Sequence, residues 1–420
     1  MILQKYKQKV VEQTKSKKFK QILSMLTSSA LGIGLGIGTS VINTRLLGPE
    51  SFGDFKFIQS IFNIMMIFFS VGIFHTGGRL IADKQFQHIR KKIFGGLFGL
   101  TFLISGLFIA TVFVSSYVQE YIFDNNLGYI IRYAAPFTFV FVFKIALDKF
   151  MEGDNLIHEL AIFQIAPKVL YVVFILIASL VLELNLMIVL GVFLLTQLVS
   201  TVYGYSKFSP DFSGFSETSK LIFAENKDHG FQIYIGALVS NGTLHLSSFI
   251  IAYYLDNTNV GYFNLANTIA TPLSMIPQVV GTAYFKDFAN SDRIPKKVIS
   301  STILISLLAF GAFILMIKYV IVFLYSEDYL PVVTLIYYIS FAYVIQGLYL
   351  VLNRFLSAHG IGRELKNASF IRGAVNIIGF VVLIKLIGTV GACITLVFSN
   401  VSYFLYLAIQ YKNFVAKRSS

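Results

Sequence analysis

The chain has 420 residues, of which 56% are hydrophobic and 13% are charged, and its mean hydropathy is +0.72. A soluble domain carries about 25% charged residues, so this composition excludes an ordinary soluble protein. The formal net charge is +13. The single cysteine, Cys393, excludes an intrachain disulfide and a metal cluster held by several thiolates.

Residues 1–20 are rich in lysine, and no short apolar core with a small-residue cleavage site follows them, so we expect no cleaved signal peptide. A basic segment beside a membrane attracts anionic lipid headgroups. We therefore interpret residues 1–20 as a cytoplasmic tail that faces lipid, and we expect no nucleic acid as a partner.

The rest of the chain is divided into apolar runs, each long enough to cross a bilayer. A helical crossing takes about 20 residues for a hydrocarbon core of roughly 30 Å. The pattern predicts an all-α integral membrane protein with about twelve transmembrane helices. The predicted spans are 21–44, 55–77, 93–117, 129–150, 159–182, 185–206, 230–254, 260–284, 298–325, 331–354, 364–387 and 389–411.

The positions of Lys and Arg between these spans predict the orientation. With the N-terminus in the cytoplasm, most of the 34 Lys and Arg residues fall on the inner side, and only Arg45, Lys56 and Lys385 fall on the outer side. A bias of this kind follows the positive-inside rule. Both termini are therefore expected in the cytoplasm.

The longest polar connection, 207–229, lies between the sixth and seventh spans. It contains a segment from Ser216 that would form a short helix in the membrane interface. We interpret 207–229 as a cytoplasmic linker between a first six-helix lobe, 21–206, and a second, 230–411. Residues 412–420 would form a second cytoplasmic tail.

Two pairs of segments suggest an internal repeat. Residues 47–55 and 255–263 each place Leu, Gly and Phe at the same spacing. Residues 149–160 and 354–365 each begin with a basic residue and Phe and end with Glu-Leu. Because the members of each pair lie on the same predicted side of the membrane, the pattern predicts two lobes related by a parallel repeat.

Several basic residues lie inside predicted spans, where a charge costs roughly 2.5–3.5 kcal/mol on the insertion scale and commonly faces a water-filled cavity. At the helical rise, Lys168 lies roughly 13 Å and Arg372 roughly 12 Å into the membrane. Lys144 is nearer the inner surface, while Arg132 and Lys318 belong to the outer part. These residues predict a cavity that attracts an anion; the alternative is that their long side chains reach the headgroups.

Uncharged polar residues also recur within the spans. Gln59 and Asn63 are four residues apart in the second span and share a helix face. Asn267 takes the place of Gln59 in the eighth span, and Asn241 and His245 are four apart in the seventh. Such groups suit hydrogen bonding to sugars, and they equally join packed helices in a membrane. Both interpretations stay open at this point.

The glycines between 32 and 38 look superficially like a phosphate-binding loop, but they follow no predicted strand and lie in an apolar run. We expect them to let a neighbouring helix approach or to let this helix bend. The sequence has no Walker A motif, no HExxH and no nucleophile elbow. We therefore expect neither a cofactor nor an enzymatic activity.

With these features, the chain resembles the Wzx-type polysaccharide flippases, the O-antigen and capsule transporters of the multidrug/oligosaccharidyl-lipid/polysaccharide exporter superfamily. The most specific stretch is NTRLLGPESFG at 43–53, followed by a span that ends in GIFHTGGRLIA at 72–82. The resemblance covers the whole chain, including the arrangement of six spans, a linker and six more spans.

The resemblance implies alternating access by two lobes around a cationic central cavity. The implied cargo is an undecaprenyl-diphosphate-linked oligosaccharide for O-antigen, lipopolysaccharide or capsule, carried from the inner to the outer leaflet of a bacterial cytoplasmic (inner) membrane. Membrane lipid and other polysaccharide-assembly membrane proteins are the implied partners. Arg79 is the one substrate-binding residue that the motif itself implies.

Two alternatives stay open. A cation-coupled multidrug exporter of the same superfamily would favour membrane-embedded carboxylates, and the first, second, seventh and eighth spans contain none. A membrane polysaccharide polymerase or ligase would need a large outer loop with catalytic residues, and the predicted outer loops are short. The candidate substrate-binding residues are Arg79, Lys168, Arg372, Lys144, Gln59, Asn63, Asn241, His245 and Asn267.

Overall fold

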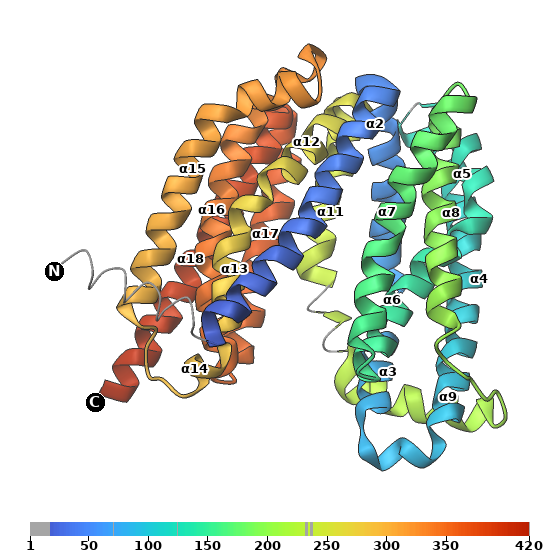
Figure 1. Cartoon of the computed structure of the whole chain (residues 1–420), viewed down its shortest axis with the longest axis horizontal. Helices are drawn as coiled ribbons and strands as arrows, with labels where there is room; N and C mark the ends of the chain where they lie inside the picture. The colour runs from blue at the N-terminus through green and yellow to red at the C-terminus, as the bar shows by residue number, and fades with distance from the viewer. Residues whose placement is uncertain (1–16, 70, 124, 232–233, 236–237, 420) are drawn as a thin grey trace. The chain divides into compact units, whose positions relative to one another are not determined.

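The computed structural model describes residues 17–419 apart from 70, 124, 232–233 and 236–237 (Figure 1). Every regular element among these residues is helical, and none is a strand. The prediction of an all-α protein is therefore confirmed. Most of the predicted N-terminal tail lies outside the described residues.

The elements up to the end of the linker are α2 (Lys17–Phe69), α3 (Ile73–Ala82), η1 (Lys84–Ile89), α4 (Arg90–Phe123), α5 (Gly128–Ala134), η2 (Ala135–Phe137), α6 (Phe139–Gly153), α7 (Ile157–Val181), α8 (Leu186–Tyr205), α9 (Phe215–Glu225) and the π-helical turn η3 (Asn226–Gly230). The elements after it are η4 (Leu238–Gly242), α11 (Thr243–Tyr254), α12 (Asn257–Ala270), α13 (Pro272–Ala283), α14 (Phe285–Ala289), α15 (Lys296–Leu324), η5 (Glu327–Tyr329), α16 (Pro331–Ala358), α17 (Gly362–Ile387) and α18 (Thr389–Ser419).

These helices form two compact units. The first unit comprises Gly38–Tyr262, and the second comprises the residues up to Ile37 together with Phe263–Ser420. We call them the 38–262 unit and the C-terminal unit, and each is described by itself. The lobe boundaries predicted on either side of the linker stay a prediction.

Helix α2 continues through the first predicted outer loop with a single break. Gly48 leaves helical geometry, with φ 70° and ψ 175°, and Pro49 follows it. The ring of a proline disfavours helical geometry in the residue before it, and the positive φ is open to Gly48 because it has no Cβ. The LGP sequence therefore forms a kink where two predicted spans meet.

The described residues include eight helices that are long and apolar enough to cross a membrane. The segments 128–137 and 139–153, bent by 44° relative to one another, would together form a ninth crossing. The bend follows Pro136, which has no backbone N–H to continue the helix. The protein is thus a multi-pass membrane protein, whereas the count of twelve spans and the side of each terminus stay predictions.

The core of the 38–262 unit is built on aromatic rings. Phe98 of α4 is fully buried, and its ring centroid lies 4.9–6.4 Å from those of Phe143, Phe150, Tyr205 and Phe208. Inside a bilayer, helices associate through close packing rather than through the exclusion of water. Edge-to-face aromatic pairs, each worth roughly 0.5–1.5 kcal/mol, therefore join α4, α6 and α8.

The C-terminal unit has its own core. The fully buried ring of Phe355 on α16 lies 5.6 Å from the ring of Phe288 and 5.2 Å from that of Tyr411. Helices α17 and α18 form a tight hairpin, because Gly388 between them adopts a φ of 64°. A Cβ at Gly391 would overlap the backbone of α17, so a larger residue there would open the hairpin.

The linker contains the predicted short helix, α9, and the structure places it against α4. Glycines of α4 make room for it: a Cβ at Gly96 would lie 2.9 Å from Thr218 Cβ, and a Cβ at Gly99 would overlap the ring of Phe215. Ile222 of α9 is fully buried. Ile222 therefore packs against protein, whereas Phe223 is exposed, and the expected position of α9 in the membrane interface stays a prediction.

The glycine series of the first span is not explained by close packing. A Cβ at Gly32, Gly34, Gly36 or Gly38 would meet no described atom within 4 Å. Bending of α2, the other use that we expected for these glycines, stays a prediction.

Candidate functional site

A cavity of about 410 Å³ lies among α2, α6, α7 and α8 within the 38–262 unit. Lys56, Lys144 and Lys168 line it. None of its described lining residues is Asp or Glu, so the wall is basic. The other polar lining residues are side-chain amides and hydroxyls: Asn43, Gln59, Asn63, Gln164, Gln197, Thr39, Ser40 and Tyr171.

Helix α2 supplies one wall because its polar residues recur at helical spacing. Lys56, Gln59 and Asn63 share one face, and Lys56 Nζ donates to Gln59 Oε1 at 3.2 Å. The same ammonium group lies 5.5 Å from the ring centroid of Phe52 and 5.8 Å from that of Phe55. Cation–π attraction and the hydrogen bond hold the charge of Lys56 at the cavity.

Helix α7 supplies a second wall of the cavity, again through residues that recur at helical spacing. Gln164, Lys168 and Tyr171 all line the cavity. The Tyr171 hydroxyl donates to Asn43 Oδ1 on α2. Gln164 Nε2 donates to Asp148 Oδ1 on α6 at 3.1 Å. These two hydrogen bonds join α7 to both neighbouring walls.

The chemistry of this wall suits an anion that carries hydroxyl groups. Lysine ammonium groups are compact charges with three donors each, and side-chain amides both donate and accept. Asp148 is not a lining residue, but its carboxylate accepts from the lining residue Gln164 and interacts electrostatically with Lys144, so it offsets part of the lysine charge.

Four predicted residues come together in this cavity, namely Gln59, Asn63, Lys144 and Lys168. They come from three helices, α2, α6 and α7, and within the described residues they belong to one unit. Their contact with a substrate stays a prediction.

Arg79 and His245, the other predicted residues of the 38–262 unit whose side chains are described, do not line the cavity. The Arg79 guanidinium forms an ion pair with the Glu225 carboxylate at the end of α9. His245 lies half-buried on α11, outside the lining. The side chain of Asn241 lies outside the described residues.

Arg372 and Asn267 belong to the C-terminal unit. The Arg372 guanidinium carbon lies 5.7 Å from the ring centroid of Tyr349 and 5.9 Å from that of Tyr403. Asn267 donates to a backbone carbonyl of its own helix at 2.8 Å, and its Oδ1 accepts from the Tyr343 hydroxyl at 3.4 Å. Both side chains are therefore held by neighbours within their unit, and a substrate role for them stays a prediction.

Lys56 also lines the cavity, although its place at the start of the second predicted span had assigned it to the outer side. The signal was present, because Lys56 lies three and seven residues before Gln59 and Asn63 and so shares their helix face. Asn43 and Tyr171 gave no such signal, since their hydrogen bond joins residues 128 positions apart.

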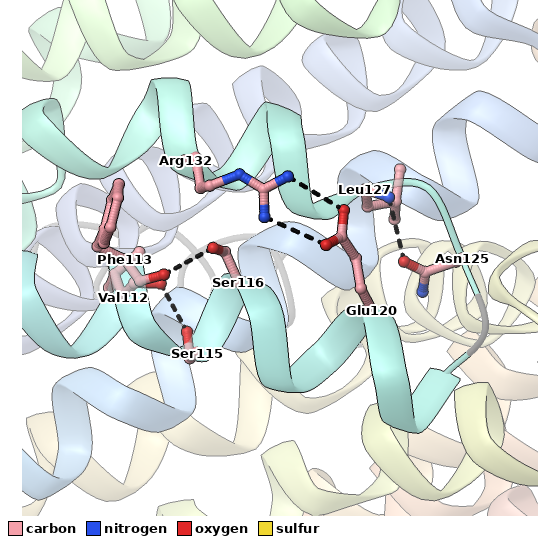
Figure 2. A network of polar contacts seen from close by, with 8 residues as sticks. All are labelled: Val112, Phe113, Ser115, Ser116, Glu120, Asn125, Leu127 and Arg132. Carbon is pink, nitrogen blue, oxygen red and sulfur yellow. Dashed lines mark hydrogen bonds and ion pairs between the residues drawn. The ribbon is translucent and has the colours of Figure 1, made fainter.

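Arg132, which we expected in the outer part of the membrane, lies outside the cavity and is paired with a carboxylate (Figure 2). Its Nη1 and Nη2 donate to the two carboxylate oxygens of Glu120 at 3.1 Å and 3.3 Å. Its guanidinium carbon lies 4.4 Å from the ring centroid of Tyr117. Arg132 therefore joins α5 to the end of α4.

Replacing Arg132 with Gln should lower the free energy of unfolding by about 1 kcal/mol or less, because the pair is only partly buried. The measurement is thermal unfolding in detergent. A much larger loss of stability would show that the ion pair contributes more than its partial exposure allows.

Among the described residues, no group of three or more His, Cys, Asp or Glu could hold a metal ion. A family model described as "Polysaccharide biosynthesis protein" matches residues 19–285, more than half of the chain. The chain belongs to this family. No curated protein matches the chain closely enough to count as a relative.

Solved structures show where this fold occurs. The chain is similar to "Lipid II flippase MurJ, inward closed conformation", with a TM-score of 0.74 and 14% identity over 93% of this chain and 87% of that one. It is also similar to an inward-facing multidrug resistance MATE family transporter of the MOP superfamily, with a TM-score of 0.73 and 14% identity over 96% and 100%. At these identities the similarity shows the fold alone, which is that of these membrane transporters.

Proposed function

We propose that this protein is a flippase for an undecaprenyl-diphosphate-linked oligosaccharide. In this proposal it carries the repeat unit of an O-antigen, capsule or related polysaccharide from the inner to the outer leaflet of the bacterial cytoplasmic membrane. The observation that carries the proposal is a cavity lined by Lys56, Lys144 and Lys168 and by no acid among its described residues. Membership in a polysaccharide biosynthesis family supports the glycan part.

The charge of the cavity agrees with a diphosphate. A diphosphate esterified at both ends carries two negative charges, and it cannot cross hydrocarbon unaided because burying an unpaired charge is prohibitive. The three lysines, partly offset by the Asp148 carboxylate that interacts with Lys144, supply a similar positive charge. Ammonium donors would replace the hydration of the phosphates as they leave water.

The size of the cavity limits what it holds at one time. Small-ligand pockets range from about 300 to 1,000 Å³, so 410 Å³ suits the diphosphate and the first sugar rather than a whole repeat unit. The amides of Gln59, Asn63 and Gln197 would bond the sugar hydroxyls. The lipid tail would stay in the bilayer while the head group crosses.

The nearest rival is a cation-coupled multidrug exporter, because MATE transporters share this fold. A cavity whose described charged lining residues are all lysines repels organic cations, and the rival is therefore disfavoured. The energy source of the proposed flippase would be an ion gradient or the consumption of the cargo on the outer side.

The direct test replaces single cavity lysines in cells that lack their own copy of the gene. Lys168→Ala and Lys144→Ala should each lower surface glycan about tenfold, because each removes a charged hydrogen-bond donor worth roughly 1.5–3 kcal/mol. Lys84→Ala, at an exposed position of η1, is the matched control and should change nothing. Immunoblots of the membrane fraction establish equal amounts of protein.

The same variants should then be reconstituted in vesicles that contain a polyprenyl-diphosphate-linked sugar, with its appearance on the outer side as the readout. Arg372→Ala tests the predicted residue of the C-terminal unit in the same way. Unchanged flipping in both the Lys144 and the Lys168 variants would remove the cavity from the transport path. Export of organic cations by the reconstituted protein would favour the rival function.

A further inference from the structure

The helical backbone breaks between α2 and α3, and a side chain of the linker bridges this break with hydrogen bonds. Val71 and Gly72 both adopt positive φ values, 41° and 79°, which frees the Val71 carbonyl from helical hydrogen bonding. Asn226 Nδ2 donates to this carbonyl at 3.0 Å. The Thr76 hydroxyl, on the first turn of α3, donates to Asn226 Oδ1, also at 3.0 Å. One amide thus bridges both sides of the break.

This bridge is buried and tightly packed. Asn226 is 6% exposed and Thr76 is 1% exposed. A Cβ at Gly72 would overlap the Gly230 carbonyl, and a Cβ at Gly230 would lie 2.7 Å from the Gly72 carbonyl oxygen. The backbones of the two segments therefore touch. Residues 226–230 form a π-helical turn, a geometry that is uncommon and often found at functional sites.

The other end of the same segment is fastened to α4. The Asp211 amide donates to the Lys91 carbonyl at 2.9 Å. A Cβ at Gly95 would overlap the Asp211 carbonyl. We call residues 211–230 the strap. Because it is fixed to α4 at its start and to the Val71–Gly72 turn and α3 at its end, the strap is part of the 38–262 unit and not a free tether.

Arg79 lies beside the buried end of the strap, and its guanidinium is paired with Glu225, directly before Asn226. Arg79 is 45% exposed and Glu225 is 28% exposed as side chains. We propose that Arg79 is a positioning residue, which holds the strap across the α2–α3 break and does not contact the cargo.

The break lies at the end of a helix that lines the cavity, so the strap can affect the cavity wall. Helix α2 carries Lys56, Gln59 and Asn63 in the wall of the lysine cavity and ends at the break. A strap that fixes the direction of α3 relative to α2 therefore fixes the end of the helix that presents these side chains. The motif arginine would act on transport through this helix.

A charge exchange distinguishes the two roles of Arg79. In Arg79→Glu the carboxylates at 79 and 225 repel one another, and Glu225→Arg does the same with two cations. If Arg79 acts through Glu225, the double variant Arg79→Glu/Glu225→Arg restores the pair and the function. If Arg79 binds an anionic cargo, the double variant places a carboxylate at the cargo and stays inactive.

The first readout is hydrogen exchange of the amides at 226–230 in the full-length protein in nanodiscs. We expect the single variants to exchange about 5-fold faster, as the loss of a partly exposed pair allows, and the double variant to return to the original rate. The second readout is surface glycan, which should follow the same order. Only the second readout rests on the proposed function.

Two variants of the buried residue Thr76 test the strap without changing any exposed charge. Thr76→Val removes the donor to Asn226 and should raise exchange about tenfold or more, because it leaves a buried acceptor unsatisfied, whereas Thr76→Ser should behave as the original. Arg132→Gln, which breaks a comparable ion pair elsewhere in the same unit, should leave exchange of the strap unchanged.

Two results would overturn the proposal. Unchanged exchange in Arg79→Glu would show that the ion pair does not hold the strap. Restored exchange without restored export in the double variant would show that Arg79 acts on the cargo. If the unchanged protein flips no lipid-linked glycan, the proposed function fails while the exchange measurements still decide the role of the strap.

Discussion

Replacing Lys56 with Glu should lower the flipping of a diphosphate-linked glycan on the order of 100-fold or more. The change removes one cation and adds one anion in a wall where Lys144 and Lys168 are the other charged residues described. Two unit charges about 6 Å apart interact by roughly 3 kcal/mol at an effective dielectric constant near 20. Each lost attraction and each new repulsion toward the cargo is of that order.

The matched variant Lys56→Met separates charge from shape. It keeps the aliphatic stem beside Phe52 and Phe55 and removes only the ammonium group. We expect its rate of flipping to fall about 10- to 100-fold, to a value between those of the original protein and of Lys56→Glu. Flipping is measured in vesicles, with Lys84→Glu, at an exposed position of η1, as a control for charge reversal outside the cavity. Equal activity of Lys56→Glu and Lys56→Met would argue against an anionic cargo at this wall.

Replacing Gly53 with Ala should destabilise the protein by about 3 kcal/mol, at the upper end of what overpacking costs. A Cβ at Gly53 would overlap the Asn257 carbonyl group and lie 2.8 Å from the Thr258 amide nitrogen. These neighbours are backbone atoms, so no side-chain rotation relieves the overlap. The start of α12 would have to move away from α2, which would also stretch the 2.7 Å hydrogen bond from Asn257 Nδ2 to Asp54 Oδ1.

The same substitution elsewhere in α2 gives the control. A Cβ at Gly38 meets no described atom within 4 Å, so Gly38→Ala should raise stability by about 0.5–1 kcal/mol through helix propensity. The measurement is thermal unfolding of both variants in detergent. If Gly53→Ala unfolds at the temperature of the original protein, α2 and α12 do not pack as closely as described.

The close contact at Gly53 also bears on the predicted repeat. Gly53 and Gly261 occupy equivalent places in the two segments that share Leu, Gly and Phe at one spacing. A Cβ at Gly261 would lie 2.9 Å from Gly53 Cα. Equivalent residues of the two segments therefore lie against one another, while the parallel repeat predicted from the sequence stays a prediction.

The sequence was sufficient to predict the all-helical class and some of the residues that line the cavity. Gln59 and Asn63 are four residues apart, so they share a helix face whatever the tilt of α2. A lysine as deep in the membrane as Lys168 usually faces a polar cavity, because a charge in hydrocarbon is costly. Arg79 is the instructive contrast. Its motif marked it as important, but its partner Glu225 is 146 positions away, at the end of α9, and the local pattern did not predict what α9 would pack against.

The sequence by itself determined that the chain crosses a membrane many times as helices, because composition and run length act locally and each apolar run must satisfy its backbone internally. Only the tertiary structure decided which polar groups meet. It brought three lysines from three helices to one cavity, joined Arg132 to Glu120, and turned the linker into a strap. These outcomes depend on contacts between residues far apart in the chain, which no local periodicity encodes.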